Sequence, residues 1–178
     1  MQTTINSFRG DYFFLSNFYE CPVTYQGITY PNNETAFQAQ KCINDSDKTK
    51  FINLSPSAAK KLGRRVALRK DWESVKFSIM KDLVKVKFTQ NPDLAEKLLA
   101  TDNAHLEEGN TWGDRIWGTV NGTGANKLGI ILMQVRDELN LSQYKSRTIT
   151  KNSPSIKSAP SGISKPKQLS VPSNLSNP

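Results

Sequence analysis

Histidine is almost missing from this sequence, and its scarcity excludes several familiar kinds of active site. His105 is the only histidine in 178 residues. A single histidine nearly excludes catalytic triads and histidine-based metal sites of the common kinds, and we expect His105 to be structural. Cys21 and Cys42 are too few and too widely spaced for a disulfide framework or a CxxC metal site, which fits a reducing compartment. We expect no metal and no cofactor, so an acid or base in this protein has to be chiefly a carboxylate.

Long apolar runs are also missing. No run comes near the roughly 20 residues that span a bilayer. The first residues, Met-Gln-Thr-Thr-Ile-Asn, lack the charged and apolar regions of a signal peptide. The sequence predicts a soluble, cytoplasmic protein without membrane contact.

Acidic residues are absent after Leu139. The formal charge of the chain is +8, and the lysines and arginines beyond Leu139 supply most of it, so residues 1–140 are close to neutral. From Ser142 onward, Ser, Pro, Lys and Asn dominate, and such a segment cannot bury enough apolar surface to fold. We predict one folded domain, residues 1–140, and a disordered basic tail, residues 141–178, whose lysines could make weak, salt-sensitive contact with nucleic acid.

The residues that are present predict mainly helices, because apolar side chains repeat with helical spacing between capping residues. A Gln-Gly pair between two short apolar runs predicts a hairpin. The expected elements are a short strand leading into a buried loop in 8–19, a hairpin of 23–25 and 28–30, a helix from Asn32 or Asn33 to Ile43, a helix opened by Ser55-Pro56, a longer helix from Asp71 to Asn91, a helix after Pro92, a short strand at 105–106, and an amphipathic helix over about 125–139.

Glycines, tryptophans and acids are concentrated in residues 107–118, and a Gly- and Asn-rich turn continues this stretch to Asn126. Glycine lets the backbone approach a ligand closely, tryptophan offers a flat face to a base or a sugar, and carboxylates move protons or offset positive charge. Taken singly, such residues more often form turns and core. Their combination favours a binding site for a compact polar ligand that contains a ring.

A second candidate is one face of the helix that follows Asn33. Glu34, Gln38 and Lys41 share a helical stripe, which places a carboxylate, an amide and an ammonium on one side. A solvated surface face would show the same spacing. Glu34 lies at the helix N-terminus, where the helix dipole favours its charged form and predicts a low pKa. This position favours a base or an ion-pairing carboxylate over an acid.

Four strings of residues follow one another along the chain. They are Phe8-Arg-Gly-Asp-Tyr with Phe14-Leu-Ser-Asn-Phe-Tyr19, then Tyr30-Pro-x-x-Glu-x-Ala-Phe-Gln-Ala-x-Lys41, then Arg69-x-Asp-Trp72, and then Glu108-Gly-Asn-Thr-Trp-Gly-Asp-x-x-Trp-Gly118 followed by Asn126-x-Leu-Gly129. In content and order they resemble the motifs of the NADAR family, also called the YbiA-like family. The resemblance covers residues 5–139.

The resemblance implies an α+β fold: a helix-dominated single domain with a small antiparallel sheet. It also implies N-glycosidase activity. Some members cleave phosphoribosylamino-pyrimidine intermediates of riboflavin synthesis, and others remove ADP-ribose from modified guanine in nucleic acid. The sequence departs from the family at one position, because Thr35 stands where a histidine is common. Any part played by that histidine is lost or taken over here.

Cleavage of a ribosyl C1′–N bond develops oxocarbenium character, so it needs a carboxylate, a water and a group that holds the base. We expect Glu34 or Glu108 to stabilise the cation or activate water, and Asp114 to orient the sugar or act as the other carboxylate. The expected substrate-binding residues are Trp112 or Trp117 for the ring, Arg9, Lys41, Arg64 or Arg69 for phosphate, and Asn17, Gln38, Gly118 and Asn126 as hydrogen-bonding groups. Trp72 is also expected to bind substrate.

Other functions are compatible with the same residues. The expected partner is a small nucleotide-like substrate or an ADP-ribosylated nucleic acid, and the sequence indicates no oligomeric state. One alternative is a non-catalytic module that binds ADP-ribose or a nucleotide, although a pure anion binder has no need of carboxylates beside its ligand. A third possibility is a nucleic-acid-binding protein without activity, whose binding would depend on residues 142–178 and fall steeply with salt.

Overall fold

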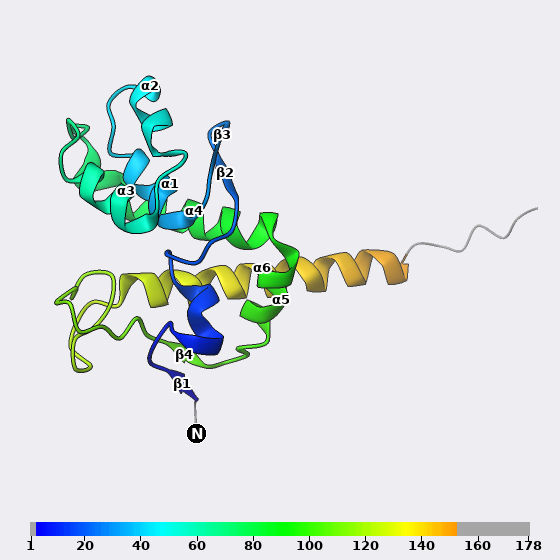
Figure 1. Cartoon of the computed structure of the whole chain (residues 1–178). Coiled ribbons are helices and arrows are strands. Elements are labelled where there is room, and N and C mark those ends of the chain that lie inside the picture. Colours follow the sequence, from blue (N-terminus) through cyan, green and yellow to red (C-terminus); the bar gives the residue numbers. More distant parts are fainter. Residues whose placement is uncertain (1–2, 153–178) are drawn as a thin grey trace, which may run out of the picture.

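The computed structural model describes residues 3–152, and Figure 1 shows how their helices and strands are arranged. Two long helices, α4 (Trp72–Gln90) and α6 (Lys127–Asn152), run side by side across the middle of the molecule. On one side of this pair lie β2 (Val23–Tyr25), β3 (Ile28–Tyr30), α1 (Asn33–Ala39), α2 (Asp45–Lys48), η2 (Thr49–Phe51) and α3 (Pro56–Gly63). On the other side lie β1 (Thr4–Ile5), the 3₁₀ helix η1 (Gly10–Leu15), β4 (His105–Leu106) and the loop after β4, while α5 (Pro92–Leu99) joins α4 to this part.

The core lies around the two long helices. Helix α4 contains no glycine or proline between Asp71 and Asn91, and its buried apolar side chains pack against several elements, among them α6, α1 and β2. Helix α6 also packs closely on β4, because a Cβ at Gly129 would stand 2.1 Å from the carbonyl oxygen of Leu106. The core side chains that α4 and α6 bury fully or almost fully are Met80, Leu83, Val84, Phe88, Leu128, Leu132 and Val135.

The structure has two small sheets. Strands β2 and β3 pair antiparallel through a turn in which Gln26 (φ 50°) and Gly27 (φ 80°) both have positive φ, as a type I′ turn requires. The predicted hairpin is therefore confirmed, and so is the α+β, helix-dominated class. Strands β1 and β4 pair in parallel, which the sequence did not predict. This second pair attaches the N-terminal segment to the start of the loop at 107–126.

Three predicted boundaries are wrong. Residues 10–15 form a 3₁₀ helix where the aromatic pattern suggested a strand. Helix α1 ends at Ala39 and not at Ile43, because Cys42 leaves the helix to form an antiparallel bridge with Leu68. Helix α6 continues to Asn152, so residues 141–152 are helical and do not belong to a disordered tail. The rest of the predicted tail, residues 153–178, lies outside the described residues.

The caps of two helices follow the predicted rules. Asn32 caps α1 through its side-chain oxygen, which accepts the amide N–H of Thr35 at 2.9 Å, and Ser55 caps α3 in the same way through the amide of Ala58. The backbone N–H of Glu34 donates to the carbonyl of Asn17 at 2.9 Å. Helix α1 is therefore fixed both by its own cap and by the segment that follows η1. No helix within residues 3–152 is long and apolar enough to cross a bilayer.

A buried ammonium holds the segment after η1 in place. Lys87 of α4 is 1% exposed, and its Nζ donates to the carbonyls of Phe14 at 2.6 Å and Ser16 at 2.9 Å. No carboxylate pairs with it within 4 Å in the described part of the chain. Burial lowers the pKa of Lys87 to about 8. The neighbouring Cys21 thiolate acts in the opposite direction.

Replacing Lys87 by methionine is expected to change how stability depends on pH. Between about pH 8 and pH 10.5 the unfolded chain keeps a proton that the folded protein has released, so this group makes the free energy of unfolding rise with pH. The rise is worth about 3 kcal/mol for a depression of this size. Urea unfolding of the wild type and the variant across this window gives the difference in their free energies of unfolding. The opposing titration of cysteines and tyrosines is common to both proteins and cancels in this difference. Parallel plots of the free energy of unfolding against pH for the two proteins would contradict a buried ammonium without a carboxylate partner.

Candidate active site

One large cavity of about 700 Å³ opens between α1, α3 and α4 on one side and two loops on the other. The loops are the N-terminal segment around η1 and the stretch after β4. The side chains of the cavity wall are Phe8, Arg9, Phe13, Ser16, Asn17, Phe18, Glu34, Phe37, Gln38, Lys41, Lys60, Arg64, Trp72, Lys76, Met80, Glu108, Trp112, Asp114, Ile116 and Trp117.

The three acids that the sequence singled out line this one cavity. Glu34 comes from α1, Glu108 follows β4, and Asp114 lies in the middle of the loop. They are brought together because β1–β4 pairing and α6 packing fix the loop opposite α1. Had Glu34 lain on the far side of the molecule, it could not have acted together with Glu108 and Asp114.

Glu34 is surrounded by groups that favour its ionised form, although it is 6% exposed. The Nε2 of Gln38 donates to its Oε1 at 2.9 Å. Burial is the largest influence and raises the pKa of Glu34, while Lys60, the Gln38 amide and Lys41 lower it and Asp114 raises it. The prediction of a low pKa from the helix dipole is therefore wrong. Loss of water around a buried carboxylate outweighs the dipole of a helix as short as α1.

Glu108 has the opposite balance of neighbours. Its pKa is raised to about 7, first by burial and then by the charges of Asp114 and Glu34, and only Lys60 lowers it. Its backbone is held by Asn126, whose Oδ1 accepts the N–H of Glu108 at 3.1 Å while its Nδ2 donates to the carbonyl of Leu106 at 2.9 Å. The environment therefore favours a proton on Glu108.

Asp114 is positioned by Asn110. The Nδ2 of Asn110 donates to the carbonyl of Asp114 at 2.7 Å and to that of Thr119 at 2.9 Å, and its Oδ1 accepts the N–H of Asp114 at 3.0 Å. In turn, Oδ1 of Asp114 accepts the backbone N–H groups of Ile116 and Trp117, each at 2.9 Å. One buried amide thus fixes the loop that presents both Asp114 and Trp117.

The three tryptophans of the site differ in exposure. Phe37 of α1 contacts the ring of Trp72 (centroids 5.0 Å apart) and meets that of Trp117 edge-on (5.3 Å), so these two indoles form part of a packed aromatic wall. Trp112 is 57% exposed, and the Arg9 guanidinium lies 6.0 Å from its ring centre. Trp112 and Arg9 therefore form an outer edge of the cavity.

Cations without acidic partners gather in the wall. Arg9, Lys41, Lys60 and Arg64 form no ion pair within 4 Å among residues 3–152, whereas Lys76 pairs with Glu73. Burial lowers the pKa of Lys41, Glu34 raises it, and Arg64 and Lys60 lower it, which indicates that three cations lie near one another. A wall of this kind is suited to an anionic group such as phosphate.

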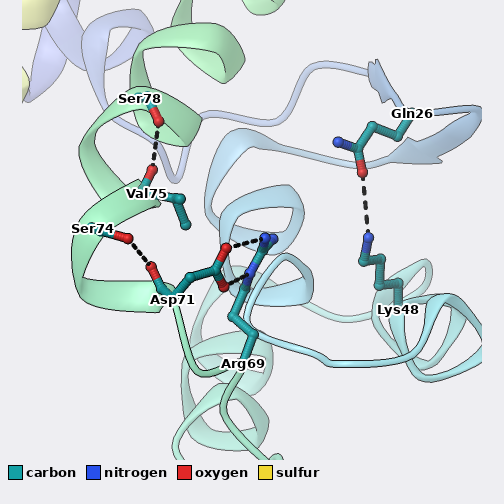
Figure 2. A network of polar contacts seen from close by, with 7 residues as sticks. All are labelled: Gln26, Lys48, Arg69, Asp71, Ser74, Val75 and Ser78. Carbon is teal, nitrogen blue, oxygen red and sulfur yellow. Dashed lines mark hydrogen bonds and ion pairs between the residues drawn. The ribbon is translucent and has the colours of Figure 1, made fainter.

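Three predicted binding residues do not line the cavity. Arg69 instead makes a bidentate ion pair with Asp71, with distances of 2.6 and 2.8 Å (Figure 2). Gly118 packs against the loop itself, because a Cβ there would stand 2.0 Å from the carbonyl oxygen of Glu108. Asn126 holds the backbone of Glu108. These positions belong to the motifs for structural reasons, and none of the three faces the ligand space.

Sequence reasoning missed several wall residues, of which Lys60 is the most informative. Lys60 lies on α3 and Arg64 is its C-cap, four residues later, and this spacing could have placed Lys60 beside the predicted Arg64. Ser16, Phe18, Lys76 and Met80 carried no such signal. Within residues 3–152 no group of three or more His, Cys, Asp or Glu side chains is arranged to hold a metal ion.

A family model described as the NADAR domain matches residues 6–140. The chain belongs to the NADAR domain family. It is 39% identical over 150 residues to the N-glycosidase YbiA of Escherichia coli strain K12, covering 80% of this chain and 93% of that protein. It is 37% identical over 132 residues to an N-glycosidase of Nostoc punctiforme, covering 70% and 83% of the two chains. A match of 39% over 130 residues to a riboflavin biosynthesis protein of Vibrio vulnificus covers 71% of this chain and 35% of that protein.

The fold agrees with a solved structure. The NMR structure of E. coli YbiA superposes with a TM-score of 0.73 at 39% identity, covering 82% of this chain and 90% of that one. The unusual Thr35 can now be placed within the NADAR fold. It is fully buried, its hydroxyl donates to Oδ1 of Asn32 at 2.8 Å, and it does not line the cavity. Thr35 thus supports the cap of α1 and takes no place in the cavity wall.

Proposed function

We propose that this protein is an N-glycosidase that hydrolyses the bond between C1′ of a phosphorylated ribosyl group and a nitrogen of a base-like ring. The observation that carries the proposal is the pair Glu34 and Glu108 in one cavity. Burial raises the pKa of both, but Glu34 has Lys60, Lys41 and the Gln38 amide beside it, whereas Glu108 faces two acids and only Lys60 lowers its pKa. Two carboxyls whose environments differ in this way can divide the roles of acid and carboxylate between them. Relatives that are named N-glycosidases support the same chemistry.

The three acids have different roles in the proposed reaction. The C1′–N bond breaks as the protonated Glu108 gives its proton to the departing nitrogen. Ionised Glu34 offsets the positive charge that develops on the sugar, and it accepts a proton from the water that attacks C1′. Asp114 orients the sugar hydroxyls. The products are the free base and the reducing sugar, and the proton taken up by Glu34 is returned to Glu108 through solvent before the next turnover.

The rest of the cavity supports binding. The indoles of Trp72 and Trp117 offer aromatic surface to the departing ring. Lys41, Lys60 and Arg64 offer three neighbouring cations to a phosphate. A cavity of about 700 Å³ is large enough for a phosphoribosyl group with its ring. Gln38, predicted to bind substrate, already uses its amide N–H on Glu34.

A phosphoribosylamino-pyrimidine of the riboflavin type is the first substrate that we propose. Two relatives carry riboflavin biosynthesis in their names, from Vibrio vulnificus and from Zea mays. ADP-ribosyl guanine is the second candidate, favoured by one observation. Trp112 and Arg9 form an exposed aromatic and cationic edge outside the buried acids, which could hold the second ring and second phosphate of an ADP-ribosyl group.

Separate incubations with the two compounds test the proposal. We expect the purified protein to release the free sugar phosphate or free ADP-ribose, detected by liquid chromatography and mass spectrometry. A non-catalytic nucleotide-binding module would bind one of these compounds, or ADP-ribose itself, and leave the N-glycosidic bond intact. Tight binding without release over many hours would therefore favour the module and contradict the enzyme.

Arginines on either side of the cavity boundary give a matched pair of variants. Replacing Arg64 by alanine is expected to raise KM about tenfold with little change in kcat, because it removes one charged contact to phosphate. Replacing Arg69 by alanine is expected to change neither constant, since its exposed ion pair with Asp71 contributes little stability and lies outside the cavity. Steady-state kinetics of both variants decide the point. An equal effect of the two would contradict the phosphate site.

A further inference from the structure

Gln38 does not use both ends of its amide. It is 5% exposed, its Nε2 donates to Glu34 at 2.9 Å, and its Oε1 is buried without a hydrogen-bond partner among residues 3–152. An unpaired buried acceptor costs free energy, so the amide is held there at some expense to stability. The direction in which the amide lies therefore needs an explanation in its surroundings.

Gly63 supplies the explanation. It is the last residue of α3, which packs on α1, and a Cβ at this position would stand 2.0 Å from Oε1 and 2.9 Å from Cδ of Gln38. The backbone does not require glycine here, because Gly63 is not among the residues with positive φ. In a helix, alanine is better than glycine by about 1 kcal/mol. Glycine at this position thus gives up helix stability and leaves space for the Gln38 amide.

We propose that Gly63 and Gln38 are positioning residues for the reaction: Gly63 leaves the space that the Gln38 amide occupies, and this amide holds the Glu34 carboxylate in one orientation and in its ionised form. The importance of Glu34 for turnover rests on the proposed function. The contact between α1 and α3 through Gln38 and Gly63 is independent of the proposed function. The sequence placed Gln38 among the substrate-binding residues, and the geometry assigns it to Glu34 instead.

Other charged groups also face Glu34 and stay unchanged in the variants below. They are Lys41 after α1, Lys60 on α3, Glu108 after β4 and Asp114 in the loop. Without the Gln38 N–H, burial and the two acids still raise the pKa of Glu34, and of the groups named here only the two lysines lower it. The pKa of Glu34 should then rise further, so a reaction that needs ionised Glu34 should lose its rate first at the acid end of its pH range.

A double-mutant cycle tests the proposal. The variants are Gln38→Ala, Gly63→Ala and the two combined, with Ser57→Ala as an exposed control on the same helix. Gln38→Ala and Gly63→Ala should each lower kcat about tenfold near pH 6, move the acid limb of the profile to higher pH, and leave KM unchanged. In the combined variant, alanine at 63 meets no amide, so it should behave as Gln38→Ala alone and unfold at a higher temperature than Gly63→Ala.

Two results would overturn the proposal. One is a wild-type pH profile in both single variants. The other is an effect of Gly63→Ala that persists undiminished when Gln38 is already alanine, since that would show a role of Gly63 in the backbone alone. The ¹³C titration of the Glu34 carboxyl in labelled protein gives the same comparison without turnover. If no N-glycosidase activity is found, an upward shift of this titration in both single variants still supports the positioning pair, and an unchanged titration rejects it.

Discussion

Replacing Glu34 by glutamine is expected to lower kcat about 10³-fold and to leave the fold intact. The loss follows from the removal of the one charge that offsets the sugar cation in a cavity closed to most water, and groups of this kind contribute 10²- to 10⁴-fold. Glutamine has nearly the same shape and can still bond to Gln38. Single-turnover kinetics with saturating substrate measure the change in the chemical step directly.

Stability should change in the opposite direction from activity in this variant. Burial raises the pKa of Glu34, so ionising this group in the folded protein costs free energy of folding. This cost appears as the pH rises above the unfolded pKa and is complete once the pH has passed the folded pKa. Glutamine removes the cost. A melting temperature above that of the wild type, together with loss of turnover, identifies a catalytic group. A lower melting temperature with a proportional loss of activity would instead mean that Glu34 serves the fold.

Replacing Glu108 by glutamine is expected to lower kcat/KM about 10²-fold at pH 7 and to abolish the alkaline limb of the pH profile. Burial raises the pKa of Glu108 to about 7, so the proton that it gives to the departing ring is lost as the pH rises through this value. The wild type should lose about tenfold in rate per pH unit above the limb. Glutamine cannot donate a proton to the departing nitrogen at any pH, so its profile should be flat there.

A substrate that needs no protonation to depart provides the control. A ribosyl compound with an already acidic leaving group should be cleaved by the Glu108→Gln variant nearly as fast as by the wild type, whereas the Glu34→Gln variant should stay slow. Equal defects of the two variants on both substrates would show that the acids do not have separate roles. An alkaline limb that survives in Glu108→Gln would assign the titration to a different group, such as Lys41.

The sequence predicted which residues share the cavity better than it predicted their ionisation. Helical spacing placed Glu34, Gln38 and Lys41 on one face, and all three line the cavity. Burial decides ionisation, and it depends on how α1 is covered by α3 and by the loop after β4. No local pattern contains this information. For this reason the helix-dipole argument gave the wrong direction for the pKa of Glu34.

Motif membership was a poor guide to the direction of side chains. Arg69, Gly118 and Asn126 lie in the motifs, yet one pairs with Asp71 and the other two hold the loop that carries Glu108. A motif does not distinguish a residue that shapes a loop from a residue that contacts a ligand. Lys60, outside every motif, was missed because a lysine on an amphipathic helix is usually solvated.

The end of helix α6 shows a limit of arguments from composition. A segment rich in Ser, Thr and Lys cannot form a core, and the sequence therefore predicted disorder from residue 141. An existing helix, however, needs no new nucleus, and each added residue costs little once Leu128, Leu132 and Val135 have fixed the first turns. The helix continues to Asn152 as a result.

The most direct test is the pH dependence of sugar release from a phosphoribosylamino-pyrimidine and from ADP-ribosyl guanine by the wild-type protein and by the two glutamine variants. A bell-shaped profile for one substrate is predicted, with an acid limb due to Glu34 and an alkaline limb near pH 7 due to Glu108. The alkaline limb should vanish in Glu108→Gln, and turnover should nearly vanish in Glu34→Gln. Intact substrate at every pH, or release that neither substitution slows, would contradict the assignment of this cavity as an N-glycosidase site.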